Sequence, residues 1–172
     1  MTLQEGFLTV NTIFEQFIGT LQTVVYIGKL LLDILQCDFF AFRVQKGRRA
    51  EFDLVKKFAE RTGAVIAVTG AIDLVADAKK AYCIYNGHPM MASITGTGCQ
   101  LSALTAAFVT ANQEHPLEAA VAAVCAMGLA GEIAHKRLTP QDGNATYRNY
   151  IIDAIYHMDG DELEHGAKFE VK

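Results

Sequence analysis

The sequence predicts an α/β fold in which helices pack on a sheet. A short, continuously apolar run, Ala64–Val68, is rich in β-branched residues and is typical of a strand buried on both faces, as in a parallel sheet. A longer alanine-rich stretch, Leu117–Lys136, is typical of a helix that packs closely on its neighbours. With 172 residues, the chain has the length of one domain with a sizeable core.

The elements before the first long helix are expected in a regular order. Apolar residues recur at helical spacing from Phe52 to Ala59, and Gly63 follows as a helix stop. The strand at 64–68 comes next, and residues 74–76 and 80–85 then have the pattern of two short strands joined by a turn. This part of the chain therefore predicts one helix and a small sheet.

The rest of the chain is predicted to be mainly helical. The helices are expected over residues 99–110, 117–136 and 147–158. Pro116 precedes the second of them, and basic residues stand at its carboxyl end, as helix termini favour. The acidic stretch Asp159–Glu164 is predicted to be a frayed tail.

Residues 1–50 differ in composition from residues 51–172. The first segment holds only two alanines, whereas the second holds the other 22 and all three prolines. We therefore divide the chain into an atypical N-terminal segment and a second portion that carries the recognisable α/β signals. The first segment is predicted to be mostly helical, although a strand at Leu21–Ile27 fits almost as well.

Charge and cysteine content exclude several classes of protein. The net charge of −4 gives no basic surface for nucleic acid or an anionic membrane. The most apolar N-terminal run, Val24–Leu35, is too short and too charged to span a bilayer, and Met1–Val10 lacks the charge pattern of a signal peptide. Four cysteines without a C-x-x-C pair make neither a disulfide framework nor a zinc site. We expect a cytoplasmic protein.

The residues Thr95-Gly-Thr-Gly-Cys99 form a glycine loop in front of an apolar helix. The first N–H groups of a helix lack internal partners and attract anions, and glycines leave room for a ligand to approach. Cys99 would lie in the first helical turn, where the helix dipole favours the thiolate form of a cysteine. The alternative is a tight turn with a buried structural cysteine. The loop matches neither the P-loop nor the dinucleotide-binding pattern.

Several motifs fall in a fixed order along residues 51–158, and together they resemble the hydroxyethylthiazole kinase family of thiamine biosynthesis. They are Arg61–Gly70, Asn86–Met90, Ile94–Cys99, Pro116–Ala120, Gly128–Glu132, Gly143–Tyr147 and Asp153–Tyr156. The resemblance implies a ribokinase-like, three-layer α/β/α fold that is incomplete at its N-terminus, because residues 1–50 do not align with the family.

The resemblance also implies an activity and roles for individual residues. The reaction is transfer of the γ-phosphoryl group of ATP to the primary hydroxyl of 4-methyl-5-(2-hydroxyethyl)thiazole, with Mg²⁺ on the phosphates. Thr69, Thr97 and Gly98 would contact ATP, and Gly96 would contact the substrate. Cys99 would be the catalytic base, at the position where the wider ribokinase-like group has an aspartate. Family members form homotrimers, and no side-chain metal ligands are assigned.

The chain departs from the family pattern in ways that leave other functions open. Ala71 stands where a glutamate is frequent and Ser93 where a lysine is frequent, and the family's substrate-binding methionine and ATP-contacting arginine have no counterpart in residues 1–50. One alternative is a kinase for a related small alcohol of the hydroxymethylpyrimidine type. Another is a non-catalytic or truncated nucleotide-binding protein, and an upstream frame change would explain the composition break.

The remaining polar candidates have structural alternatives. Asp73 and Asp77 are expected to be solvated turn residues. His88 is expected either to line the nucleotide site or to bond to the loop backbone. Cys37, Cys83 and Cys125 stand in apolar contexts and are predicted to be core thiols.

Overall fold

The computed structural model describes residues 49–172, with side chains from residue 52 onward. The expectations for the N-terminal segment, which include its helices and the strand at Leu21–Ile27, lie outside the described residues. The described elements are α3 (Arg49–Thr62), β1 (Ile66–Val68), β2 (Asp73–Ala76), β3 (Ala81–Ile84), the 3-10 helix η1 (Pro89–Ser93), α4 (Thr97–Ala111), α5 (Pro116–Arg137), α6 (Asn144–His157), α7 (Gly160–Gly166) and β4 (Phe169–Val171).

The described strands form an antiparallel sheet in the order β1-β2-β3-β4. The expectation of a parallel strand at 64–68 is therefore wrong. Only a few residues separate β1 from β2, whereas a parallel connection needs a crossover of a dozen or more. Ala67, in the middle of β1, is exposed, so this strand is not buried on both faces. The expected hairpin is confirmed as β2 and β3.

Helices cover both faces of the sheet. Leu74, Val75 and Ala76 of β2 are all buried, although successive side chains of a strand point to opposite faces. Val75 packs in the large core cluster with Ile84 and the residues of α5. On the other face, β2 and β1 pack against α3. The predicted three-layer α/β/α arrangement is confirmed.

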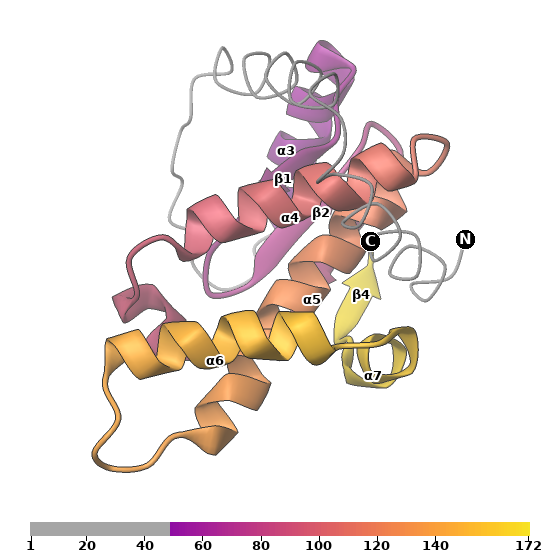
Figure 1. Ribbon diagram of the computed structural model, residues 1–172. Helices are drawn as coiled ribbons and strands as arrows, with labels where there is room; N and C mark the ends of the chain where they lie inside the picture. Colours follow the sequence, from indigo (N-terminus) through magenta and orange to yellow (C-terminus); the bar gives the residue numbers. More distant parts are fainter. Residues whose placement is uncertain (1–48) are drawn as a thin grey trace.

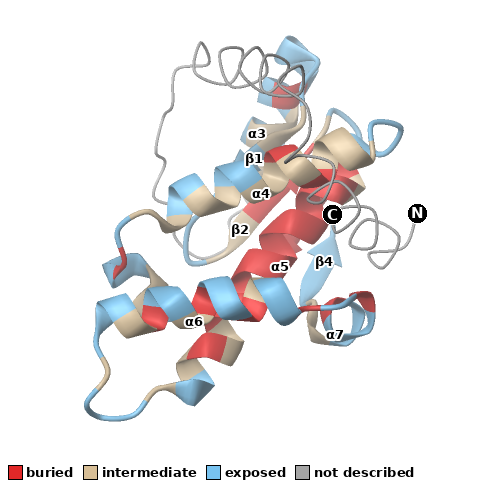
Figure 2. Cartoon of the chain, in the orientation of Figure 1, coloured by how far each residue is buried: buried red, intermediate tan, exposed pale blue. Residues whose placement is uncertain are grey.

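Helix α5 is the centre of the core. Every residue from Val121 to Ala130 is buried, and Figure 2 shows this helix as the longest buried segment of the ribbon. The small alanine and glycine residues of α5 let α4 and α6 pack closely on it. Phe108 and Tyr147 fill the spaces between the helices. By length and hydropathy, residues Pro116–Lys136 would suit a membrane span, but 83% of the most apolar window is buried inside the protein.

The C-terminal residues are more ordered than the sequence predicted. Asp159–Glu164 is not a frayed tail, because α7 begins there: the Asp159 side chain accepts a hydrogen bond from the Glu162 N–H, and Leu163 is fully buried. Strand β4 was not predicted. It has three residues, all exposed, and its partner β3 lies far back in the sequence, so no local pattern marks it.

Candidate active site

The glycine loop begins helix α4. Gly96 is the N-cap residue, with φ 96° and ψ −1°, a left-handed conformation that favours glycine. Its carbonyl accepts the first intrahelical hydrogen bond, from the Gln100 N–H at 3.0 Å. Among the described residues, no side chain caps the helix, so the N–H groups of its first turn have no side-chain acceptor there. This turn is therefore suited to an anion.

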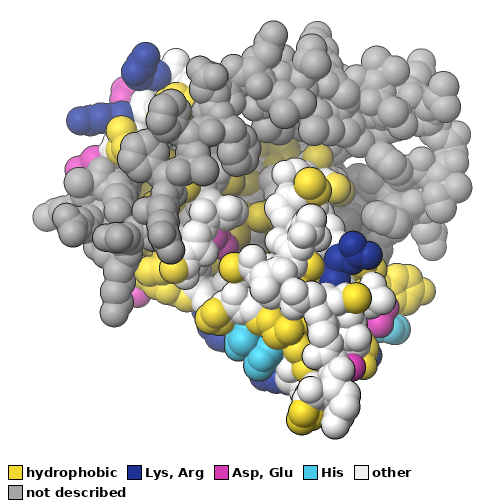
Figure 3. Space-filling view, turned by 90° about the vertical axis from the view of Figure 1, so that its left-hand side faces the viewer, with side chains coloured by type: hydrophobic (Ala, Val, Ile, Leu, Met, Phe, Trp, Pro, Cys, Tyr) yellow, Lys and Arg dark blue, Asp and Glu magenta, His cyan; other side chains and the backbone are white. Residues whose placement is uncertain are grey.

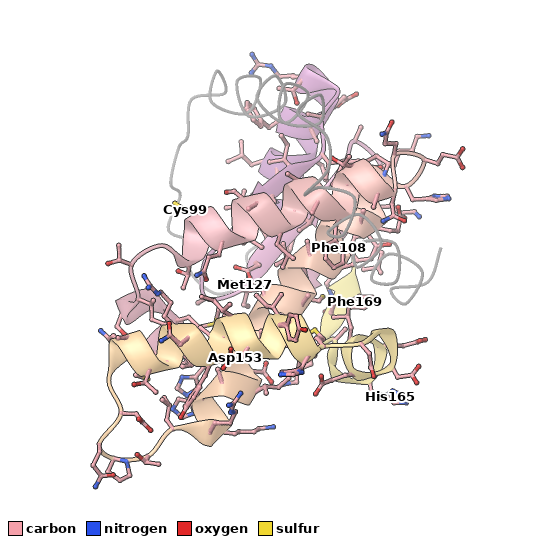
Figure 4. All side chains as sticks on the ribbon, viewed as in Figure 1. Cys99, Phe108, Met127, Asp153, His165 and Phe169 are labelled. Atoms are coloured by element: carbon pink, nitrogen blue, oxygen red, sulfur yellow. The ribbon has the colours of Figure 1, made fainter. Side chains whose placement is uncertain are left out.

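The loop is open to a ligand. A Cβ atom added to Gly96 or Gly98 would meet no atom of the described part of the chain within 4 Å. Cys99 is an exposed free thiol, and Figure 4 shows it at the start of α4, on the side turned away from α6. The alternative of a buried structural cysteine is therefore wrong. Gly96, Thr97, Gly98 and Cys99 are brought together because they are consecutive residues of one turn.

Thr69 belongs to a different part of the fold from the glycine loop. It directly follows β1, and its side chain is exposed. The next residue, Gly70, donates its N–H to Asp73 Oδ1 at 2.8 Å, which closes the turn between β1 and β2. The sheet therefore fixes Thr69, whereas the start of α4 fixes the other predicted site residues.

Asp73 and Asp77 have different surroundings. Asp77 is a turn residue as predicted, and its Oδ1 accepts the N–H groups of Lys79 and Lys80. Asp73 is not a solvated turn residue: it is half-buried at the start of β2, and burial raises the pKa of its carboxyl to about 6, against the lowering effect of the Gly70 N–H. Strand β2 is too short for an alternation of polar and apolar residues along it to indicate that Asp73 is half-buried.

This raised pKa gives a testable pH dependence. The unfolded chain releases the Asp73 proton near 3.8 and the folded chain near 6, so stability is lost as pH rises through this window, by up to about 3 kcal/mol. Asp73→Asn keeps an oxygen for the Gly70 N–H and removes the charge. We expect the variant to gain stability over the parent between pH 4 and 7, as measured by urea unfolding. A difference that does not change with pH would contradict this prediction.

Two roles were predicted for His88, and the structure shows the second of them, a bond to the loop backbone. Its Nδ1 accepts the Met90 N–H at 3.2 Å and caps η1. The ring stacks on His135 of α5, with 3.5 Å between ring centroids, and His135 in turn contacts the edge of Tyr147. Neighbouring histidine side chains, bordered by Lys or Arg, are visible in the lower part of the face in Figure 3. The predicted core thiols Cys83 and Cys125 are buried, whereas Cys37 lies outside the described residues. Burial, with a contribution from Asp73, raises the pKa of Cys125 to about 12.

The loop fits phosphate groups better than it fits a bare metal ion. Its free N–H groups suit phosphate oxygens, and the open space beside Gly96 and Gly98 admits them. Residues 95–99 contain no carboxylate, and the described residues hold no group of three or more metal-ligating side chains. A magnesium ion at this loop would have its ligands on the nucleotide rather than on these side chains.

Comparison with known proteins decides between the possible families. The sequence profile of the hydroxyethylthiazole kinase family matches residues 43–161, slightly more at both ends than the motifs indicated. The chain belongs to this family. A hydroxyethylthiazole kinase of Clostridium acetobutylicum is 56% identical over 118 residues, which cover 69% of this chain and 43% of the relative. One of Arabidopsis thaliana is 39% identical over 107 residues, covering 62% and 38%.

A solved structure confirms the fold of the matched region. The hydroxyethylthiazole kinase of Pyrococcus horikoshii OT3 superposes with a TM-score of 0.64 at 32% identity, covering 72% of this chain and 46% of that one. The predicted ribokinase-like α/β class is therefore confirmed for the described residues. The chain spans less than half the length of these relatives.

A half-buried polar cluster around Glu132 of α5 is not among the sites predicted from the sequence. This carboxylate bonds to Asn86 and Gly87, which lie before the glycine loop, and pairs with Lys168 near β4. One signal was available, because Glu132 is a charged residue within the apolar stretch Gly128–Ala134. Its partners lie 36 to 46 residues away, so the sequence alone did not identify them.

Proposed function

We propose that this chain acts in ATP-dependent phosphorylation of 4-methyl-5-(2-hydroxyethyl)thiazole, in thiamine biosynthesis or salvage. Family membership supports the reaction class. The observation that carries the proposal is the uncapped start of α4, with Gly96 in a left-handed conformation and the exposed thiol of Cys99 in the same turn. Anion binding and proton removal are thereby available at neighbouring atoms, as phosphoryl transfer to an alcohol requires.

Each loop residue has a role in this proposal. ATP, with its magnesium, supplies the transferred phosphoryl group. The N–H groups of Thr97 and Gly98 hold phosphate oxygens, and Thr69 contacts the nucleotide from the end of β1. Gly96 leaves space for the substrate beside the loop. Cys99 Sγ takes the proton of the substrate hydroxyl while that oxygen forms its bond to the γ-phosphorus of ATP. The bond between this phosphorus and the bridging oxygen of ADP breaks, and ADP leaves.

The proposal extends to the assembly and the division of the chain. We assign residues 51–172 as the C-terminal portion of the kinase and residues 1–50 as a separate segment outside the motif resemblance. Homotrimers in the cytoplasm are the proposed form. A second candidate is a nucleotide-binding protein without kinase activity, and it is favoured by one observation: within the matched region, Ala71 and Ser93 stand where the family pattern has a glutamate and a lysine.

One assay separates the two candidates. The purified chain is incubated with Mg²⁺, ATP labelled in its γ-phosphoryl group and the thiazole alcohol, and labelled thiazole phosphate is measured. The control acceptor, 4,5-dimethylthiazole, has no hydroxyl and should give no product. Hydroxymethylpyrimidine in place of the thiazole tests the related kinase. ATP binding by calorimetry without product from either alcohol would favour the non-catalytic candidate and contradict the kinase.

A further inference from the structure

One face of helix α5 holds the segment that leads from the sheet to the glycine loop. This segment, Asn86–Ser93, follows β3 and ends three residues before Gly96. A Cβ on Gly128 would overlap Asn86, and a Cβ on Gly131 would overlap the Met91 side chain, so both glycines let the segment approach closely. The α5 residues involved, Gly128, Gly131, Glu132 and His135, are spaced so that they share one side of the helix.

Glu132 is the charged group of this face. Its Oε1 accepts the Gly87 N–H at 2.9 Å and lies 3.3 Å from Asn86 Nδ2, while Oε2 pairs with Lys168 Nζ. The Glu132 side chain is only 15% exposed, which strengthens these contacts relative to surface pairs. Burial acts to raise the pKa of its carboxyl, but the Lys168 and Gly87 contacts outweigh burial and hold the pKa below its ordinary value. Glu132 is therefore a carboxylate in the folded protein at neutral pH.

Asn86 completes the attachment of the first end of the segment. It is the buried polar residue of the described core, 8% exposed, and both the nitrogen and the oxygen of its amide form hydrogen bonds. Nδ2 donates to the Gly166 carbonyl at 2.9 Å, and Oδ1 accepts the Lys168 N–H at 2.7 Å. A buried amide with these partners has one orientation, so the chain leaves β3 in a fixed direction.

The second end of the segment is attached to α6. Asn144 Nδ2 donates to the Ser93 carbonyl at 3.1 Å, and Ser93 Oγ lies 3.2 Å from Asn144 Oδ1. Ile94 then enters the core, 8% exposed. Between these ends, His88 stacks on His135 of α5. The segment is thus held at its start, middle and end before the chain reaches Gly96.

We propose that Glu132 is a positioning residue for the glycine loop, through the segment Asn86–Ser93. The expected effect on kcat rests on the proposed function, whereas the expected effect on the position of the glycine loop does not. Glu132 lies one helix away from Cys99 and acts by fixing Gly87, and with it the path into the turn that starts α4. A displacement of that turn by an ångström changes the alignment of reacting groups, which costs rate without removing any group that touches the substrate.

The test compares three variants in the full chain. Glu132→Ala removes both acceptor oxygens. Glu132→Gln keeps an oxygen for the Gly87 N–H and loses the charge. Lys168→Ala removes the ion pair and leaves the Gly87 bond in place. We expect Glu132→Ala to lower kcat by about 10- to 100-fold per folded molecule with little change in the KM for ATP, and the other two variants to keep most of the turnover.

Hydrogen exchange provides a readout that does not depend on activity. We expect Glu132→Ala to speed exchange of the hydrogen-bonded amides of Gly87, Met91, Ile94 and Gln100 relative to the α6 amides, and Glu132→Gln to restore the slower exchange. A merely structural role would speed exchange throughout and leave kcat per folded molecule unchanged, and this result would overturn the proposal. If the parent chain has no turnover, the kinase proposal fails, and exchange at Ile94 and Gln100, on either side of the glycine loop, still decides the role of Glu132.

Discussion

Cys99→Ala is expected to lower kcat for thiazole phosphorylation by about 100- to 10,000-fold, the range typical for loss of a general base. The thiol is exposed at the first turn of α4, so its removal leaves no cavity in the core. The free energy of unfolding should therefore change by less than about 0.5 kcal/mol. Initial rates of product formation and urea unfolding of the same preparations measure both quantities.

Two further variants make the role of Cys99 specific. Cys99→Asp places a carboxylate base at this position and should recover part of the lost turnover, whereas Cys99→Ser, a much weaker base, should not. Cys125→Ala is the matched control for a cysteine, because its thiol is fully buried in α5. It should reduce stability and leave kcat per folded molecule unchanged. Full turnover by Cys99→Ala would exclude the thiol as the base.

Gly128→Ala is expected to destabilise the protein by about 2 kcal/mol. Its Cβ would lie 2.6 Å from Asn86 Cβ and 2.8 Å from the Asn86 carbonyl carbon and oxygen, which are distances that real Cβ atoms do not show. The helix or the segment after β3 must move, and overpacking of this kind costs about 1–3 kcal/mol, with an added cost where the hydrogen bonds of Asn86 are strained. The higher helix propensity of alanine offsets at most about 1 kcal/mol. Urea unfolding of parent and variant measures the difference.

Gly131→Ala is the control for this prediction. The three atoms nearest to its Cβ would all belong to the side chain of Met91, which is flexible and half-buried, whereas at Gly128 the Cβ would also meet backbone atoms. The two substitutions add the same methyl group to the same helix, one turn apart, so they differ mainly in what the methyl group meets. Equal loss of stability in both variants would show that contact with the Asn86 backbone is not the cause.

The sequence was sufficient for features that depend on neighbouring residues. The helices α4, α5 and α6 and the β2–β3 hairpin were predicted from local periodicity, and the glycine loop was found because its residues are consecutive. The fold class also followed from such local signals together with the family motifs. The direction of β1 did not follow, because an apolar run of five residues indicates burial and says nothing about which strand it pairs with.

Features that depend on distant residues could not be predicted in this way. Glu132 and Asn86 are recognisable as polar residues in apolar surroundings, but their partners are fixed by the packing of α5 against the sheet and the C-terminal segment. Asp73 was misjudged for the same reason: whether its carboxylate meets water depends on α5, more than 40 residues further along the chain. Burial is a property of the assembled layers and not of the local sequence.

The C-terminal residues of the described chain form hydrogen bonds with residues that are synthesised much earlier. Asn86 bonds to Gly166 and Lys168, which are 80 and 82 positions later, and β4 pairs with β3 across a similar separation. During synthesis on the ribosome, α4 and α5 emerge and begin to pack while Asn86 Oδ1 and the edge of β3 that pairs with β4 still lack their partners in the C-terminal segment. Such distant pairings form slowly, because the entropy of closing a long loop opposes them. Chains interrupted before residue 166 would leave β3 without β4, and Asn86 without its bonds to Gly166 and Lys168. We therefore expect ribosome-stalled or proteolysed chains of this protein to be substrates for chaperones and proteases, although most of the helical core is present in them.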